Sequence, residues 1–100
     1  MEKLTKENCI LGARAIITDK KSKWNEETGA KDNGLICFKF NPEGTLYGDE
    51  LELKPGSKII IQSKPRKFND NGNQVKFTID NDPTIYSAWW ICIKSKVFVI

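Results

Sequence analysis

Polar and apolar side chains alternate along two stretches of the chain, "LICFKF" at residues 35–40 and "QVKFTI" at residues 74–79. Successive side chains of a β-strand point to opposite faces of a sheet, so a period of two predicts a strand with one buried face. The side chains that would share a face are Ile36, Phe38 and Phe40 in the first stretch, and Val75, Phe77 and Ile79 in the second. An Asn-Gly pair lies shortly before each stretch, Asn33-Gly34 and Asn71-Gly72, and its glycine supplies the positive φ of a tight hairpin turn.

Isoleucines cluster in two further runs, "GARAIITD" from Gly12 and "GSKIIIQS" from Gly56. Helical spacing is poor in both runs, and β-branched side chains favour strands. The segments at residues 84–93 and 96–100 are again rich in strand-forming residues, and the one helical turn we expect lies near residues 5–8. This pattern predicts an all-β fold, a small SH3-like barrel or sandwich of about six to seven strands in one domain over residues 1–100.

The two glycine-led runs belong to a longer internal repeat. With an offset of 44 positions, "GARAIITDKKSKWN" from residue 12 aligns without a gap on "GSKIIIQSKPRKFN" from residue 56. With an offset of 39, "FKFNPEGTLYG" from residue 38 aligns on "FTIDNDPTIYS" from residue 77. We therefore expect two pseudo-repeated halves, about residues 9–52 and 53–100, that begin with equivalent strands. The alternative is chance similarity between two strand-rich segments of similar composition.

One segment of the second half resembles a known fold. "DELELKPGSKIII" at residues 49–61 is similar to the diverging turn and following strand of SH3-like barrels, including the KOW type, in which an "L-x-P-G-x-x-(I/V)" step leads into a strand. The tandem Trp89-Trp90 is similar to the paired tryptophans of many SH3 domains, and the resemblance covers about residues 51–100. It implies a barrel and not recognition of proline-rich peptides, because the acidic loop and Pro/Tyr groove of those domains are not recognisable. In style, the small lysine-rich chain also resembles accessory proteins of T4-type tailed phages.

The composition argues against catalysis and metal binding. The chain has no histidine, and its three cysteines, Cys9, Cys37 and Cys92, form no C-x-x-C pair. A cysteine nucleophile needs a base, and a structural zinc site needs four nitrogen or sulfur ligands, so we expect no enzyme, no cofactor, no metal and unpaired thiols. The chain has no long apolar run and no signal-peptide pattern near Met1. We therefore expect no membrane partner and a cytoplasmic location, in the host cytoplasm if a phage encodes the chain.

Each glycine-led run ends in cations followed by an aromatic ring and an asparagine. The cations and rings are Lys20, Lys21, Lys23 and Trp24 in the first run, and Lys64, Arg66, Lys67 and Phe68 in the second. Cations contact phosphates, and a ring that stacks on an unpaired base contributes about 1–3 kcal/mol. The pattern predicts that two basic–aromatic loops bind nucleic acid, although the net charge of +3 is modest. The alternative for each ring is a plug that closes one end of the barrel. Glu26 and Glu27 dilute the positive charge after Trp24, so the second run is the better candidate.

The two adjacent tryptophans would point to opposite faces of a strand. Ile91 and Ile93 share the parity of Trp89, so we expect Trp89 inside and Trp90 outside, beside Cys92. An exposed tryptophan is a favoured anchor of protein interfaces. Trp90 therefore marks the competing function, a protein-binding factor such as a phage-type inhibitor or modulator of a host protein. The alternative is that the C-terminal tail covers both rings.

Overall fold

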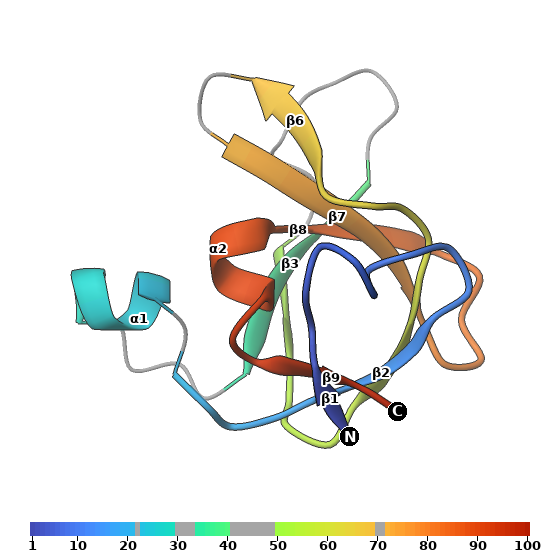
Figure 1. Cartoon of the computed structure of the whole chain (residues 1–100), viewed down its shortest axis with the longest axis horizontal. Helices are drawn as coiled ribbons and strands as arrows, with labels where there is room; N and C mark the ends of the chain where they lie inside the picture. Colours follow the sequence, from blue (N-terminus) through green and yellow to red (C-terminus); the bar gives the residue numbers. More distant parts are fainter. Residues whose placement is uncertain (22, 30–33, 41–49, 70–71) are drawn as a thin grey trace.

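The computed structural model describes residues 1–21, 23–29, 34–40, 50–69 and 72–100, except for four side chains within α1 and β6, those of Lys23, Trp24, Phe68 and Asn69. Antiparallel strands dominate this part of the chain, which confirms the all-β class (Figure 1). The strands are β1 (Glu2–Lys3), β2 (Arg14–Ile17), β3 (Leu35–Lys39), β4 (Glu50–Leu53), β5 (Lys58–Ile61), β6 (Arg66–Asn69), β7 (Gly72–Ile79), β8 (Ile85–Trp89) and β9 (Val97–Val99). Two short helices, α1 (Lys23–Thr28) and α2 (Trp90–Ile93), correct the expectation of a single helical turn.

The strands form one sheet in the order β1-β9-β2-β5-β7-β8-β3-β4, and β6 pairs with β7 beside β5. Among the described residues no pairing joins β1 to β4, so the nine-stranded sheet is open and is not the closed barrel of six to seven strands that the sequence predicted. The edge strand β4 explains why the sheet ends there. Its residues Glu50, Leu51 and Glu52 are exposed, and charged side chains on an edge strand oppose further pairing.

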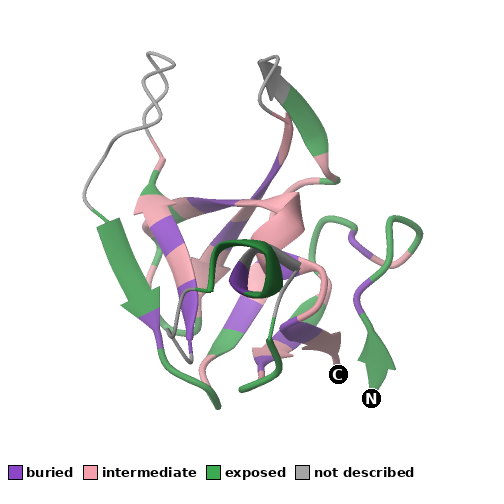
Figure 2. Cartoon of the chain, turned by 90° about the vertical axis from the view of Figure 1, so that its left-hand side faces the viewer, coloured by how far each residue is buried: buried purple, intermediate pink, exposed green. Residues whose placement is uncertain are grey.

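The sheet curves around a hydrophobic core. Its buried residues follow the predicted alternation in β7, but the predicted face of β3 is wrong, because Leu35 and Cys37 are buried in the core whereas Ile36, Phe38 and Phe40 are only half-buried. Ile59 and Ile61 of β5 and Val75 and Phe77 of β7 are at most 1% exposed. The N-terminal segment, α2 and β9 complete the core with Leu4, Cys9, Ile93 and Val97. Figure 2 shows that the C-terminal half of α1 and most of β4 are exposed at the surface. One face of the central strands is therefore packed against the core, and the opposite face carries half-buried side chains such as Ile60 and Lys76.

The glycine-led strands β2 and β5 are equivalent and pair with each other. Gly12 and Gly56 both have positive φ angles, 88° and 94°. The Gly12 amide donates to the Ile61 carbonyl at 2.8 Å, and the Gly56 amide donates to the Ile17 carbonyl at 2.7 Å. These bonds exchange under the offset of 44 positions that aligns the two runs, so the repeat is a local two-fold arrangement of two strands.

The equivalence of the two halves ends after these strands. The chain forms helix α1 after β2, whereas it forms strand β6 after β5. β7 then pairs with β5, but β3 pairs with β4 and β8 and not with β2. The prediction of two fully equivalent halves is therefore wrong beyond the glycine-led strands. In the second half, β6 and β7 form a hairpin, and β7 pairs with β5. In the first half, helix α1 lies between β2 and β3 in the chain, and among the described residues these two strands do not pair.

The two predicted Asn-Gly turns also differ. Gly72 has a φ of 130°, and Asn69 pairs with Gly72, which confirms the hairpin between β6 and β7. Gly34 has no positive φ. A Cβ atom added there would lie 2.1 Å from the Leu53 carbonyl oxygen, so close approach of the backbone of β4 requires this glycine. Both preceding asparagines, at positions 33 and 71, lie outside the described residues.

The tryptophan pair does not lie in one strand. β8 ends at Trp89 and α2 begins at Trp90, so the alternation argued for the pair does not apply. Both rings are half-buried, and Trp90 and Cys92 pack against the core. Trp89 lies opposite Gln74 of β7, while their neighbours Ala88 and Val75 are buried in the core. The expectation that Trp89 is inside and Trp90 outside is therefore wrong, because a helix replaces the predicted strand.

Candidate nucleic-acid interface

The first basic–aromatic run leads into a helix. Lys20 and Lys21 are exposed ahead of α1, and the Lys20 ammonium lies 4.5 Å from the centre of the Phe98 ring. Lys23 and Trp24 belong to α1, where their side chains lie outside the described structure. The first turn of α1 contains Glu26, whose charge offsets that of the lysines. The predicted basic loop is therefore a short helix of mixed charge.

The second run forms an exposed hairpin strand. Lys64 is exposed just before Pro65, and Arg66 and Lys67 are exposed on β6. Phe68 lies in the same strand, with its side chain outside the described structure. β6 and the start of β7 project beyond the rest of the sheet (Figure 1). The cations of this run therefore extend along one arm, where a chain-like ligand can reach them.

The two runs do not form a single site. α1 packs against α2, and α2 packs against β7. In the described part of the chain, the strand β6 pairs with β7 and is not among the elements that pack against α1. Figure 1 accordingly shows α1 and β6 on different sides of α2. The two runs therefore lie on separate parts of the surface, and the hairpin arm is a candidate site of its own.

A row of three side chains crosses the base of the arm. Arg66 of β6 lies opposite Gln74 of β7, and Gln74 lies opposite Trp89 of β8. Val75 and Ala88, the next residues of β7 and β8, are buried in the core, so Gln74 and Trp89 occupy the other face of the sheet. This Arg66–Gln74–Trp89 row combines a cation, an amide and an indole ring. The sequence alone did not predict this row, because the register between strands cannot be read from a sequence.

The amide of Gln74 stands out within this row. Its side chain is 7% exposed, and its Nε2 atom has no hydrogen-bond partner in the described part of the structure. An unsatisfied buried donor costs about 1–3 kcal/mol, which a purely structural residue seldom carries. The Trp89 ring lies beside β7 on the same face. A Cβ atom added at Gly72, two positions before Gln74, would be 3.9 Å from this ring.

The same face of the sheet continues with a further cation and aromatic ring. Lys76 follows Gln74 by two positions on β7 and lies opposite Ser87 of β8. The Lys76 ammonium lies 4.1 Å from the centre of the Phe40 ring, at the end of β3. This geometry is a cation–π contact, which holds the ammonium on the sheet face.

Two of the three cysteines are buried and are poor nucleophiles. No disulfide bond joins Cys9, Cys37 and Cys92, as the sequence predicted. Burial raises the pKa of the Cys9 thiol to about 11 and that of the Cys37 thiol to about 12. Because the thiolate is the reactive form, these two side chains are inert at neutral pH.

The described ranges contain neither a metal-binding cluster nor a membrane-spanning helix. No group of three or more cysteine, aspartate or glutamate side chains in these ranges is placed to hold a metal ion, and the sequence has no histidine. Within the same ranges, neither α1 nor α2 is long and apolar enough to cross a membrane.

Comparison with known proteins gave no significant match: no protein-family model, no curated protein and no solved structure matches this chain. The resemblance of residues 49–61 to SH3-like barrels therefore stays a prediction from the sequence.

Proposed function

We propose that this protein is a non-catalytic module that binds a single strand of nucleic acid along the β6–β7 hairpin. The observation that carries the proposal is the Arg66–Gln74–Trp89 row, in which a cation, an unpaired amide and an indole lie side by side on three strands. A cytoplasmic location, in the host if a phage encodes the chain, belongs to the same proposal.

The proposal assigns each group a physical role. Lys64, Arg66 and Lys67 are exposed and neutralise phosphates, which releases condensed counterions. Aromatic rings stack on unpaired bases, and this role is proposed for Trp89 of the row and for Phe68, which follows the cations along β6. Small β-proteins commonly bind single strands with one sheet face and its loops.

The first run has a secondary role in this proposal. Lys20, Lys21, Lys23 and Trp24 lie at or before α1, away from the hairpin. Glu26 and Glu27 on the same helix repel phosphates, so these cations add to the positive field without forming a second strand-binding site.

A protein partner anchored on Trp90 is the competing hypothesis. Trp90 packs against the core and is half-buried, which limits the area it can offer to a partner. The apolar side chains that are most exposed near a turn are Ile10 and Leu11, at 46% and 71%. If the protein binds no oligonucleotide, Ile10 and Leu11 become candidate contacts for a protein partner.

The affinity for a fluorescently labelled single-stranded oligonucleotide, measured by anisotropy, tests the proposal. The Lys64→Ala/Arg66→Ala/Lys67→Ala variant should bind more weakly than the parent. A control variant, Lys3→Ala/Lys6→Ala/Lys54→Ala, removes the same charge from exposed positions outside β6 and β7. Equal weakening in both variants would indicate a general charge effect and would contradict a binding site on β6.

Phe68→Ala separates stacking from a structural role. A stacking ring contributes about 1–3 kcal/mol to binding and releases few ions, so affinity should fall while its salt dependence stays unchanged. Loss of a buried phenylalanine instead costs about 3–5 kcal/mol of stability and leaves the binding of the folded fraction unaltered. Urea unfolding and anisotropy on the same variant distinguish the two roles.

A further inference from the structure

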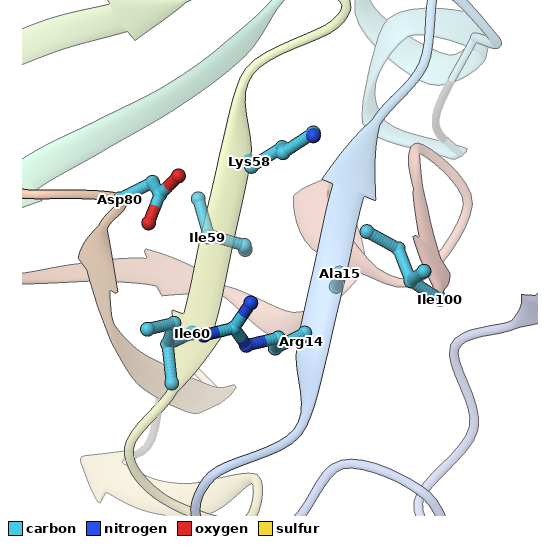
Figure 3. Close-up of a pocket in the computed structure, with 7 residues that line it drawn as sticks. All are labelled: Arg14, Ala15, Lys58, Ile59, Ile60, Asp80 and Ile100. Carbon is cyan, nitrogen blue, oxygen red and sulfur yellow. The ribbon is translucent and has the colours of Figure 1, made fainter.

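A shallow pocket of about 160 Å³ lies over β2 and β5, away from the hairpin. Arg14, Lys58, Ile60, Asp80 and Ile100 contribute side chains to its lining (Figure 3). Ala15 and Ile59, between the two cations, have buried side chains, so Arg14 and Lys58 project from the opposite face of the sheet. The pocket thus lies on the same sheet face as the Arg66–Gln74–Trp89 row.

The internal repeat places two cations at the same pocket, on neighbouring strands. Arg14 and Lys58 are equivalent under the offset of 44 positions. The register pairs Arg14 with Ile60 and Lys58 with Ile16, so the cations flank the central pair of two antiparallel strands symmetrically. Figure 3 shows the Arg14 side chain reaching from β2 over β5, and the Lys58 side chain reaching from β5 toward β2.

The charges of the pocket are not neutralised by ion pairs. Within the described ranges, neither the Arg14 guanidinium nor the Lys58 ammonium has an ion-pair partner within 4.0 Å. Asp80 supplies one carboxylate beside the pocket, and its backbone amide donates to the Lys58 carbonyl at 3.0 Å. Two cations and one carboxylate leave one net positive charge, which suits a monoanionic ligand.

We propose that this pocket binds a phosphate group. A guanidinium donates two parallel hydrogen bonds to phosphate oxygens, and an ammonium adds a point charge. Ile60 and Ile100 border the pocket with apolar surface. The phosphate is either a free ion or a phosphodiester of a nucleic-acid strand, and the second source rests on the proposed function.

The position of the pocket fits the second source. Thr78 of β7 lies opposite Ile60, and it follows Gln74 by four positions on the same strand face. Four strand residues span about 13 Å. A nucleic-acid strand that contacts the hairpin arm therefore reaches the pocket within a few nucleotides. On the way it passes Lys76, which lies between the arm and the pocket.

Amide chemical shifts of the labelled protein, followed by NMR, test the inference. Sodium phosphate is titrated against sodium chloride of matched ionic strength, and a single-stranded oligonucleotide is titrated separately. Both should shift the amides of Arg14, Lys58 and Asp80 saturably. Arg14→Gln and Lys58→Gln should each weaken phosphate binding about tenfold, and Asp80→Asn should strengthen it up to about fivefold. Lys54→Gln, at an exposed position outside the pocket lining, should leave it unchanged.

The outcomes separate the two proposals. If phosphate shifts the pocket amides but the oligonucleotide binds nowhere, the pocket is a free-phosphate site and the proposed function fails. If the oligonucleotide binds the hairpin while neither ligand shifts the pocket amides, the proposed function stands and the phosphate site is refuted. Equal effects of Lys54→Gln and Lys58→Gln would also refute it. The spectra of the variants themselves report whether each one is folded.

Discussion

The two basic–aromatic runs share a sequence pattern, yet the first forms helix α1 and the second forms strand β6. Pro65 explains part of the difference, because it has no amide hydrogen and disfavours helical backbone at Lys64. The first run has no proline, and Glu26 in the first turn of α1 interacts favourably with the helix dipole.

The partner available to each run explains the rest. Gly72, with its φ of 130°, turns the chain so that β7 can pair with β6 directly. No such strand follows the first run, because β3 pairs with β4 and β8. Similar segments therefore adopt different structures when only one of them is given a neighbouring strand. The consequence for function is that only the second run extends its cations along an arm.

The glycines at the two predicted turns should give the largest contrast in stability. Gly34→Ala places a Cβ atom 2.1 Å from the Leu53 carbonyl oxygen, so it should cost about 4 kcal/mol or more, or prevent folding. Gly72→Ala meets only backbone strain, and it should cost about 1–3 kcal/mol. Urea unfolding measures both, and equal costs would contradict the assigned difference in cause.

The buried Lys96 should give the next largest effect. Its side chain is 1% exposed, and its ammonium donates to the carbonyl of Gly34, the residue that leads into β3 after α1. Lys96→Met leaves a buried carbonyl without this donor and should cost about 1–3 kcal/mol. Lys54→Met, at an exposed position, should change stability by less than about 0.5 kcal/mol. Matching effects in the two variants would show that the Lys96 contact contributes nothing.

The equivalence of β2 and β5 predicts equal costs for two further substitutions. Gly12 and Gly56 have φ angles of 88° and 94°, and no atom lies within 4 Å of a Cβ added at either position. Gly12→Ala and Gly56→Ala should each cost about 1–2 kcal/mol from backbone strain alone. Thermal or urea unfolding would contradict the two-fold arrangement if only one of the variants were destabilised.

The buried thiols predict a loss of stability at alkaline pH. The Cys9 thiol donates to the Ser63 carbonyl at 3.6 Å, and Cys37 is a core residue of β3. Their pKa values rise on folding, from 9.0 to about 11 and about 12. Above pH 9 the unfolded chain ionises first, so each thiol should reduce stability by up to about 1.4 kcal/mol per pH unit until its folded pKa is reached.

A variant without these thiols provides the control for that measurement. The Cys9→Ala/Cys37→Ala protein should show a flatter decline of stability between pH 9 and pH 11 than the parent, whatever its stability at neutral pH. An unchanged slope would contradict the raised pKa values.

The sequence predicted the parts of the fold that depend on local pattern. The strands β2, β3, β5 and β7 and the turn at Gly72 follow from period-two alternation, β-branched residues and an Asn-Gly pair. The strand order, the open edge at β4 and the role of Gly34 depend on contacts between distant segments, so no local pattern carried them.

The candidate sites divide in the same way. The exposed cations of β6 were found from the sequence, because clustered lysine and arginine residues are visible there. Gln74 and Trp89 were missed, since only the register of three strands puts them beside Arg66. The alignment already matched Arg14 with Lys58, but only the pairing of β2 with β5 places both at one pocket.

The most direct test of the account is the salt dependence of single-strand affinity for the parent and for Lys64→Ala/Arg66→Ala/Lys67→Ala. Each phosphate contact contributes about 0.7 to the slope of log affinity against log salt concentration. Binding along β6 predicts that the parent binds at low salt and that the variant has a slope smaller by about 2. A parent that binds no oligonucleotide at low salt, or a variant with the parent's affinity and slope, would contradict the proposal.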